Sequence, residues 1–260
     1  MSNWPTNFDL LHQGEEGIRE QSKAAIMVSP DLTAHITTIE PAISVLRHVI
    51  LRDERKDQDD LTVRLLTIRL MNDITSALKL LMAGYYQNST LIQRDVVETV
   101  FLLEDFDKDR SLIALWRDSD EKDRKKKFGP VEVRKRLDAF YGHTQNKRAE
   151  AYKLFCELAA HPHPKGFAML RAAGSDLHNA GPFFDETALK ATLSELARST
   201  IQCLEVVSAF FAFASREDRE IQFAAFFAKL QWMERFYERS YDRSEIAGIR
   251  AAIDRIPHAT

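Results

Sequence analysis

Two charged residues, Arg94 and Glu98, lie one turn apart in a segment of the chain, residues 91–106, whose apolar residues are spread nearly all the way round a helix. The apolar positions leave no broad polar face on a helix, which indicates a central helix rather than a surface one. Side chains four residues apart on a helix are neighbours. An exposed pair of this kind contributes only about 0.3–0.5 kcal/mol, whereas removing one partner of a buried pair costs about 3–5 kcal/mol. The pair therefore indicates either a structural tie or a buried polar site, and the sequence leaves both open.

A second polar group lies where a later predicted helix, 147–160, ends, and it consists of Tyr152, Glu157, His161 and His163. We expect this end to lie against Arg94. A buried Arg–Glu pair can hold a histidine in one tautomer, and an arginine can bind an anion while a histidine transfers protons. The candidate catalytic residues are therefore Arg94, Glu98 and His161. The candidate binding residues are Tyr152 and His163. The alternative is that the pair is only a structural tie and that His161 caps its helix.

A basic run at residues 122–127 supplies three more candidate binding residues, Lys125, Lys126 and Lys127. Clustered lysines can follow the phosphates of a nucleic acid. Acidic residues surround this run, however, and no aromatic residues alternate with it as stacking platforms for bases. The pattern favours a solvated surface, and contact with RNA remains the alternative.

The histidines and cysteines raise the question of a metal site. His161 and His163 are two residues apart, and Cys156 and His143 are further possible ligands. A structural zinc site needs four ligands at a recognisable spacing, and no second pair of this kind occurs in the sequence. The chain also lacks a phosphate-binding loop, a dinucleotide-binding glycine pattern, a zinc-protease motif and a nucleophile elbow. The sequence therefore predicts no metal and no cofactor.

Long helices must position these side chains, because the chain is poor in residues that break helices. Its 260 residues include 9 glycines and 8 prolines, and 45% are hydrophobic and 29% charged, as is ordinary for a globular protein. We predict an all-α fold, a single-domain helical bundle of about eight to ten helices. The predicted helices span residues 7–27, 31–52 (with a kink or restart at Pro41), 61–84, 91–106, 111–116, 130–141, 147–160, 185–214, 221–237 and 244–256.

Three segments between these helices have compositions that do not predict a helix. Residues 52–60 and 216–219 are charged, which predicts a connector and a break. Residues 166–184 contain glycines between two apolar flanks, which predicts one small β-hairpin packed on the bundle. Within the single domain, the parts are N-terminal helices at 1–58, a central bundle at 59–215 and C-terminal helices at 216–260.

Charge and cysteine content bear on compartment and partners. The formal net charge of −3 gives no general reason to expect binding to nucleic acid or membranes. Two cysteines in a chain of this length form no disulfide framework, which fits a reducing compartment. The N-terminal segment has no signal-peptide pattern, and no apolar run reaches the length of a membrane span. We expect a cytoplasmic protein without a membrane partner.

The predicted helix at 221–237 is rich in aromatic residues, among them Phe226, Phe227 and Trp232. A dense aromatic stripe at helical spacing is more often a core or an interface than a cofactor site. These three residues exceed the need of a terminal helix unless its outer face is covered. They therefore predict a homodimer or another protein partner that binds through this helix.

Residues from about 60 to 215 resemble a family of bacterial helical proteins of unknown function. The resemblance lies in four segments, GYYQNSTLIQRDVVETVFLLEDF, LWRDSDEKDRKKKFGPVEVRKRL, YKLFCELAAHPHPKG and AGPFFDE. Members of that family carry an Arg and a Glu one turn apart on a central helix, followed by a helix that ends in a His. The matching positions here are Arg94, Glu98 and His161.

A looser similarity connects the chain with HEPN-like defence and toxin proteins. Two functional hypotheses follow. The first is a binding or scaffold protein that associates with itself or with a larger assembly. The second, which the looser resemblance implies, is a metal-independent ribonuclease that uses Arg94 and His161 and steers phosphates with the basic run at 122–127.

Overall fold

The computed structural model describes residues 5–52 and 57–257, and its regular structure is entirely helical. Helices make up 80% of the chain, and no strand occurs within these ranges, which confirms the all-α prediction. No helix in the described part of the chain is long and apolar enough to cross a membrane. The elements are α1 (Thr6–Val28), α2 (Pro30–Leu51), α3 (Gln58–Met82), α4 (Tyr86–Lys108), α5 (Ser111–Asp118), α6 (Glu121–Phe128), α7 (Pro130–Tyr141), α8 (Lys147–Phe155), the π-helix η1 (Cys156–Ala160), the 3-10 helix η2 (Pro164–Leu170), α9 (Glu186–Ser208), α10 (Arg216–Tyr237) and α11 (Arg243–Asp254).

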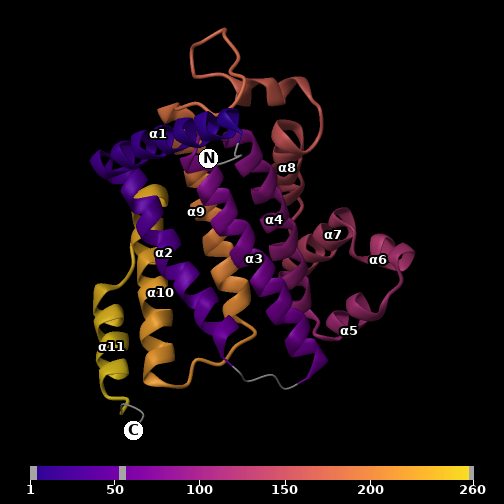
Figure 1. Cartoon of the computed structure of the whole chain (residues 1–260). Helices are drawn as coiled ribbons and strands as arrows, with labels where there is room; N and C mark the ends of the chain where they lie inside the picture. Colours follow the sequence, from indigo (N-terminus) through magenta and orange to yellow (C-terminus); the bar gives the residue numbers. More distant parts are fainter. Residues whose placement is uncertain (1–4, 53–56, 258–260) are drawn as a thin grey trace.

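Four long helices, α2, α3, α4 and α9, run side by side through the middle of the molecule (Figure 1). Helix α9 packs on the other three, and α3 packs on α4. Helix α1 lies across one end, the short helices α5, α6 and α7 stand on one flank, and α10 and α11 stand on the other. Helix α10 packs on α2, and α11 packs on α10.

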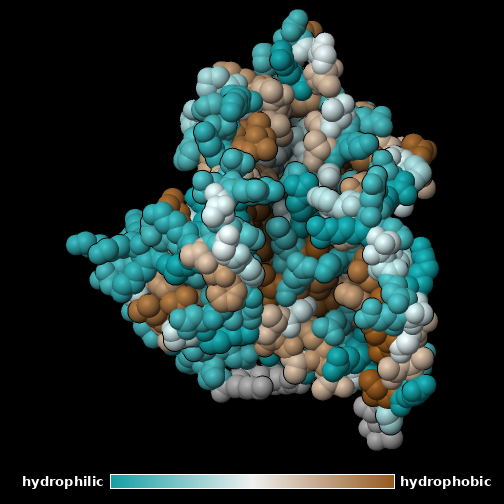
Figure 2. Space-filling model, turned by 180° about the vertical axis from the view of Figure 1, so that it is seen from behind, coloured by the Kyte–Doolittle hydropathy of each residue, from teal (hydrophilic) through white to brown (hydrophobic). Residues whose placement is uncertain are grey.

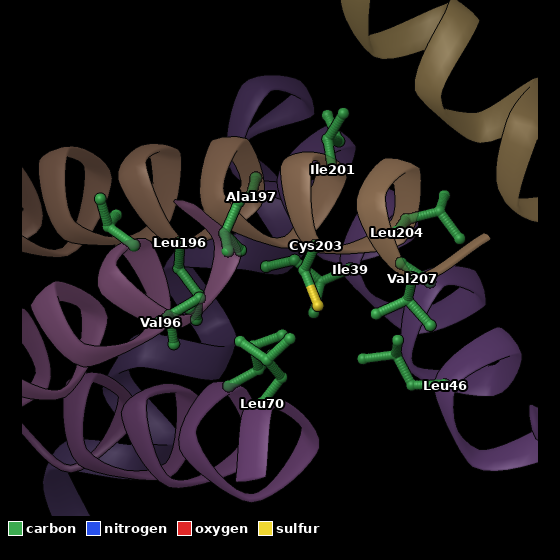
Figure 3. Close-up of a cluster of buried hydrophobic side chains, with 14 of the residues drawn as sticks. Ile39, Leu46, Leu70, Val96, Leu196, Ala197, Ile201, Cys203, Leu204 and Val207 are labelled. Atoms are coloured by element: carbon green, nitrogen blue, oxygen red, sulfur yellow. The ribbon is translucent and has the colours of Figure 1, made fainter. Parts of the chain in front are cut away.

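The hydrophobic core lies where the four long helices meet. Figure 3 shows Ile39 and Leu46 of α2, Leu70 of α3 and Val96 of α4 gathered against Cys203 and its apolar neighbours on α9. Ile39, Leu46, Leu70, Val96 and Cys203 each have at most 1% of their surface exposed. Burial of one such side chain contributes about 1.5–3 kcal/mol to the stability of the fold. The four packed helices therefore form a stable frame on which the outer helices lie.

Helix α4 is enclosed on several sides, as its apolar pattern predicts. It packs on α3, α9, α7, α8 and η1. Val96, Val100 and Phe106 are almost fully buried. The prediction of a central helix at 91–106 is therefore confirmed, although the helix begins earlier, at Tyr86.

Two predicted interruptions of helices turn out to be helix. Residues 216–219 form the first turn of α10, where Ser215 and Asp218 cap each other's backbone N–H groups. A charged residue three positions after a serine is a helix-start signal, which explains the wrong prediction of a break there. Helix α2 continues through Pro41 as one helix, so the predicted restart is wrong; the packing of α2 on α9 and α10 outweighs the cost of a proline inside a helix. Of the predicted connector at 52–60, residues 53–56 lie outside the described residues, and Asp57 caps α3.

The predicted β-hairpin at 166–184 is wrong. The segment instead begins with η2 and continues as an irregular loop that projects from one end of the bundle (Figure 1). The backbone N–H of Asn179 donates to Leu170 at 2.8 Å, but this single bond between the flanks does not extend into a ladder. The loop is held at its far end, where the N–H of Phe183 donates to the carbonyl of Gly84 at 3.4 Å. Proline at the first position of η2 and the glycines that follow favour turns over strands.

Candidate functional site

The predicted cluster of Arg94, Glu98 and Tyr152 forms where α8 packs against α4. Arg94 Nη2 donates to Glu98 Oε1 at 2.6 Å and to the hydroxyl oxygen of Tyr152 at 2.5 Å. Arg94 Nε donates to the same hydroxyl at 3.1 Å, and the hydroxyl donates to Glu98 Oε1. The three side chains therefore form a closed triangle in which each one is a partner of the other two.

This cluster is half-buried rather than fully wet or fully buried. The side chains of Arg94 and Glu98 are 24% and 25% exposed. Burial and the Glu98 carboxylate raise the pKa of the Tyr152 phenol well above its usual range. The phenol therefore stays protonated at neutral pH and serves as a hydrogen-bond donor rather than as an acid. The geometry is that of a tie between α4 and α8.

Arg134 of α7 is a member of this neighbourhood that the sequence analysis missed. Its guanidinium lies over the Tyr152 ring at 4.3 Å from the centroid, and that of Arg94 lies at 5.2 Å. Arg134 is only 8% exposed, and its Nε and Nη1 groups contact no acceptor. The aromatic face is therefore its main electrostatic partner. A helical face shared with the buried Leu137 was the signal that could have identified it.

The two histidines do not join the cluster. His161 is exposed and follows η1, and within the described residues no hydrogen bond or ion pair joins its side chain to Arg94 or Glu98. The turn just before His161, η1, lies next to Gln87 of α4, whose side chain donates a hydrogen bond to the carbonyl of Leu158. Gln87 is seven residues before Arg94, or roughly 10 Å along α4. His163 Nδ1 accepts a hydrogen bond from the backbone of the nearby Lys165.

The remaining possible metal ligands are also dispersed. Cys156 is half-buried on η1, and His143 stacks on Tyr141 beyond the end of α7. Across residues 5–52 and 57–257, no three side chains of His, Cys, Asp or Glu come together with metal-binding geometry.

The predicted basic surface lies on α6. Lys125 pairs with Glu121 at 2.6 Å, and Lys127 pairs with Asp123 at 3.0 Å, each one turn along the same helix. Lys126 has no such partner in the described chain. Two of the three lysines are therefore paired with acids on the same helix, as expected for a solvated face.

A different region, between α9, α10 and α11, contains a pocket of about 530 Å³. Most of its lining residues belong to these three helices, and Ala214 and Ile256 come from the segments next to them. On the rear face of the molecule, hydrophobic side chains lie in hollows between hydrophilic ones and along the edge that carries the C-terminal helix (Figure 2). The lining residues are Leu204, Glu205, Ser208, Ala214, Arg219, Gln222, Phe223, Phe226, Lys229, Ile249, Ala252, Ile253 and Ile256.

Some polar residues that line this pocket have a side-chain partner, and others have none within the described residues. Lys229 Nζ lies 2.5 Å from a carboxylate oxygen of Glu205. The side chains of Arg219, Ser208 and Gln222, by contrast, make no hydrogen bond or ion pair within the described residues. Their donors remain available to a molecule in the pocket.

The three predicted partner residues of α10 have different environments. Trp232 is only 3% exposed, and its Nε1 donates to Nδ1 of the buried His35 on α2 at 2.8 Å. Trp232 is therefore a core residue, which corrects the prediction that it faces a partner. Phe227 stacks on Phe223, and Phe226 is 37% exposed and lines the pocket. Helix α11 covers part of the outer face that the sequence left unassigned.

Comparisons of this chain with models of protein families, with curated proteins and with solved structures found no match.

Proposed function

We propose that this protein is a binding protein and that its binding site is the pocket between α9, α10 and α11. The observation that carries the proposal is the pocket itself. Its volume of about 530 Å³ falls within the range of roughly 300–1,000 Å³ that is usual for small-molecule sites. Its walls are mainly apolar, with Leu204, Phe226 and Ile253 from three different helices. A small apolar guest therefore fits it better than a polar one.

The polar cluster on α4 supports binding over catalysis, because its three side chains are hydrogen-bonded to one another and the candidate histidine is not among them. Arg94, Glu98 and Tyr152 satisfy one another, and His161 lies apart from them. A general base must reach the proton that it removes, directly or through one water. The ribonuclease hypothesis therefore lacks the contact between Arg94 and His161 on which it depends.

The test uses the fluorescence of Nile red, an uncharged apolar dye, with two variants of α11. Ala252 lines the pocket, whereas its neighbour Ala251 does not, and both are exposed. We expect the wild-type protein and Ala251→Trp to bind the dye, and Ala252→Trp to lose binding because the indole fills the pocket. Equal binding by both variants, or none by the wild type, would contradict the proposal.

Self-association through α10 and α11 is a second proposal, and it rests on the exposed apolar side chains of these helices. Phe226 and Ile249 are each 37% exposed, and Tyr237 is 42% exposed. An apolar surface of this kind is a common basis for an interface between two copies of a chain. Light scattering should then show a mass of about twice the 29.9 kDa of one chain. A monomer at every concentration would rule it out.

A further inference from the structure

We propose that the pocket between α9, α10 and α11 takes an amphipathic organic anion, with its apolar tail between the three helices and its anionic head at Arg219. The inference rests on the proposed binding function of the same pocket and adds the chemistry of the ligand. A medium-chain carboxylate is the simplest molecule of this class.

The shape of the pocket favours a long ligand with two different ends. Helices α10 and α11 run antiparallel, since Arg216 at the start of α10 reaches the last carbonyls of α11. Along α10 the lining residues recur at helical spacing from Arg219 to Lys229. Ten residues of helix span roughly 15 Å. The apolar side chains of Phe223 and Phe226 lie between these two ends.

The charges at the two ends differ. At one end Lys229 is neutralised by Glu205, with an N–O distance of 2.5 Å. At the other end Arg219 has no acidic partner in the described chain. Two of the acids beside it on α10 are engaged elsewhere, because Glu220 pairs with Arg216 and Asp218 pairs with His48, and the third, Glu217, does not line the pocket. This end of the pocket therefore carries a net positive charge.

The polar groups near the positive end suit an anionic head. A guanidinium presents planar N–H donors that match a carboxylate. The hydroxyl of Ser208 and the amide of Gln222 line the same pocket and have no other side-chain partner among the described residues. A cationic head would be repelled by Arg219, and a wholly apolar guest would leave these donors unused. The exposure of Arg219 means that the head stays partly in water, so its charge gives preference rather than great affinity.

The first experiment compares three ligands that share one tail. Isothermal titration calorimetry of the full chain with octanoate, octanol and octylammonium varies only the charge of the head group. We expect octanoate to bind most tightly, then octanol, then octylammonium. If the three bind equally, the inference about charge fails while the apolar pocket stands. If none binds, the inference and the proposed function both fail.

The second experiment removes the positive charge. Arg219→Gln should weaken octanoate binding roughly three- to tenfold and leave octanol binding unchanged, because the variant keeps a polar side chain but loses the cation. The matched control is Arg239→Gln, since Arg239 is also exposed but does not line the pocket. Circular dichroism confirms that both variants remain folded. An unchanged preference for octanoate in Arg219→Gln would overturn the assignment of the head group to this residue.

Discussion

The cluster around Tyr152 and the pocket beside α10 both place an arginine next to aromatic side chains at a partly exposed position. They differ in what the arginine contacts. Arg94 has a carboxylate and a phenol within hydrogen-bond distance, whereas Arg219 has no side-chain partner in the described chain. A charged group that its own chain satisfies adds stability, and one that it leaves unsatisfied is available to a ligand. The comparison therefore favours Arg219 over Arg94 as the arginine of the proposed binding site.

The two regions should also respond to pH in opposite directions. Behind the pocket, burial lowers the pKa of His35 from its usual 6.5 to about 4. Beside the α4 cluster, burial and the neighbouring carboxyl of Asp95 raise the pKa of Asp73 from 3.8 to about 7. Between pH 4 and 6.5 the unfolded chain takes up a proton at His35 that the folded chain does not, so acid destabilises the fold. Over nearly the same window the folded chain holds a proton on Asp73 that the unfolded chain lacks, so acid stabilises it.

The largest predicted effect is a change in the pH dependence of stability when Asp73, one of these two opposing groups, is replaced. We expect the free energy of unfolding of the wild type to change little between pH 4.5 and 6.5, because His35 and Asp73 offset each other. In Asp73→Asn only the contribution of His35 remains, and the free energy of unfolding should rise by about 2 kcal/mol from pH 4.5 to pH 6.5. Urea denaturation across this range measures it.

The exposed Asp176 provides the control for this experiment. Its side chain is solvated, so Asp176→Asn should keep the flat profile of the wild type. A flat profile in Asp73→Asn as well would mean that His35 titrates near its usual pKa, and that the inner side of α10 is less well sealed than the burial of Trp232 indicates.

The sequence predicted the α4 cluster well because its signals are local and periodic. The spacing of Arg94 and Glu98 brings them together on any helix, and the enclosing apolar pattern identified α4 as central. The contact with Tyr152 was also expected. What the sequence did not contain was the direction of the chain after Cys156, where a π-helix and then extended residues carry His161 away.

The sequence did not predict the pocket, because the pocket has no local or periodic signal. It depends on the distances between α9, α10 and α11 in the folded protein, and no residue pattern specifies a gap between helices. Arg219 lay in a segment interpreted as a charged break, although Ser215 and Asp218 form a capping box there. The prediction of a hairpin at 166–184 failed for a similar reason, because its flanks share a single backbone hydrogen bond and the segment is held by a long-range contact between Phe183 and Gly84.

The next largest effect concerns the cluster itself. Arg94→Ala should reduce the free energy of unfolding by about 1–2 kcal/mol, which is less than the roughly 3–5 kcal/mol for a fully buried pair. The cost is smaller because Glu98 keeps the Tyr152 hydroxyl as a donor and a quarter of its side chain remains exposed. Chemical denaturation measures it, and octanoate binding should stay unchanged.

A second helical pair provides the comparison. Lys125 and Glu121 have the same spacing as Arg94 and Glu98 but are more than three-quarters exposed. Lys125→Ala should therefore change stability by less than about 0.5 kcal/mol. A loss as small as this in Arg94→Ala would contradict the view that the cluster ties α4 to α8.

The smallest predicted effect on stability is the one that separates the two arginines. Arg219→Ala should change the free energy of unfolding by no more than about 0.5 kcal/mol, because the side chain is exposed and contacts no acid in the described chain.

Adding octanoate then distinguishes Arg219→Ala from Arg94→Ala further. A ligand that binds only the folded state raises the midpoint of thermal unfolding, and at a given concentration the rise is larger when the ligand binds more tightly. The rise should be full in Arg94→Ala, which has lost stability, and reduced in Arg219→Ala, which has not. If Arg219→Ala instead destabilises the protein as much as Arg94→Ala does, Arg219 belongs to the structural contacts of α10, and the difference between the two regions disappears.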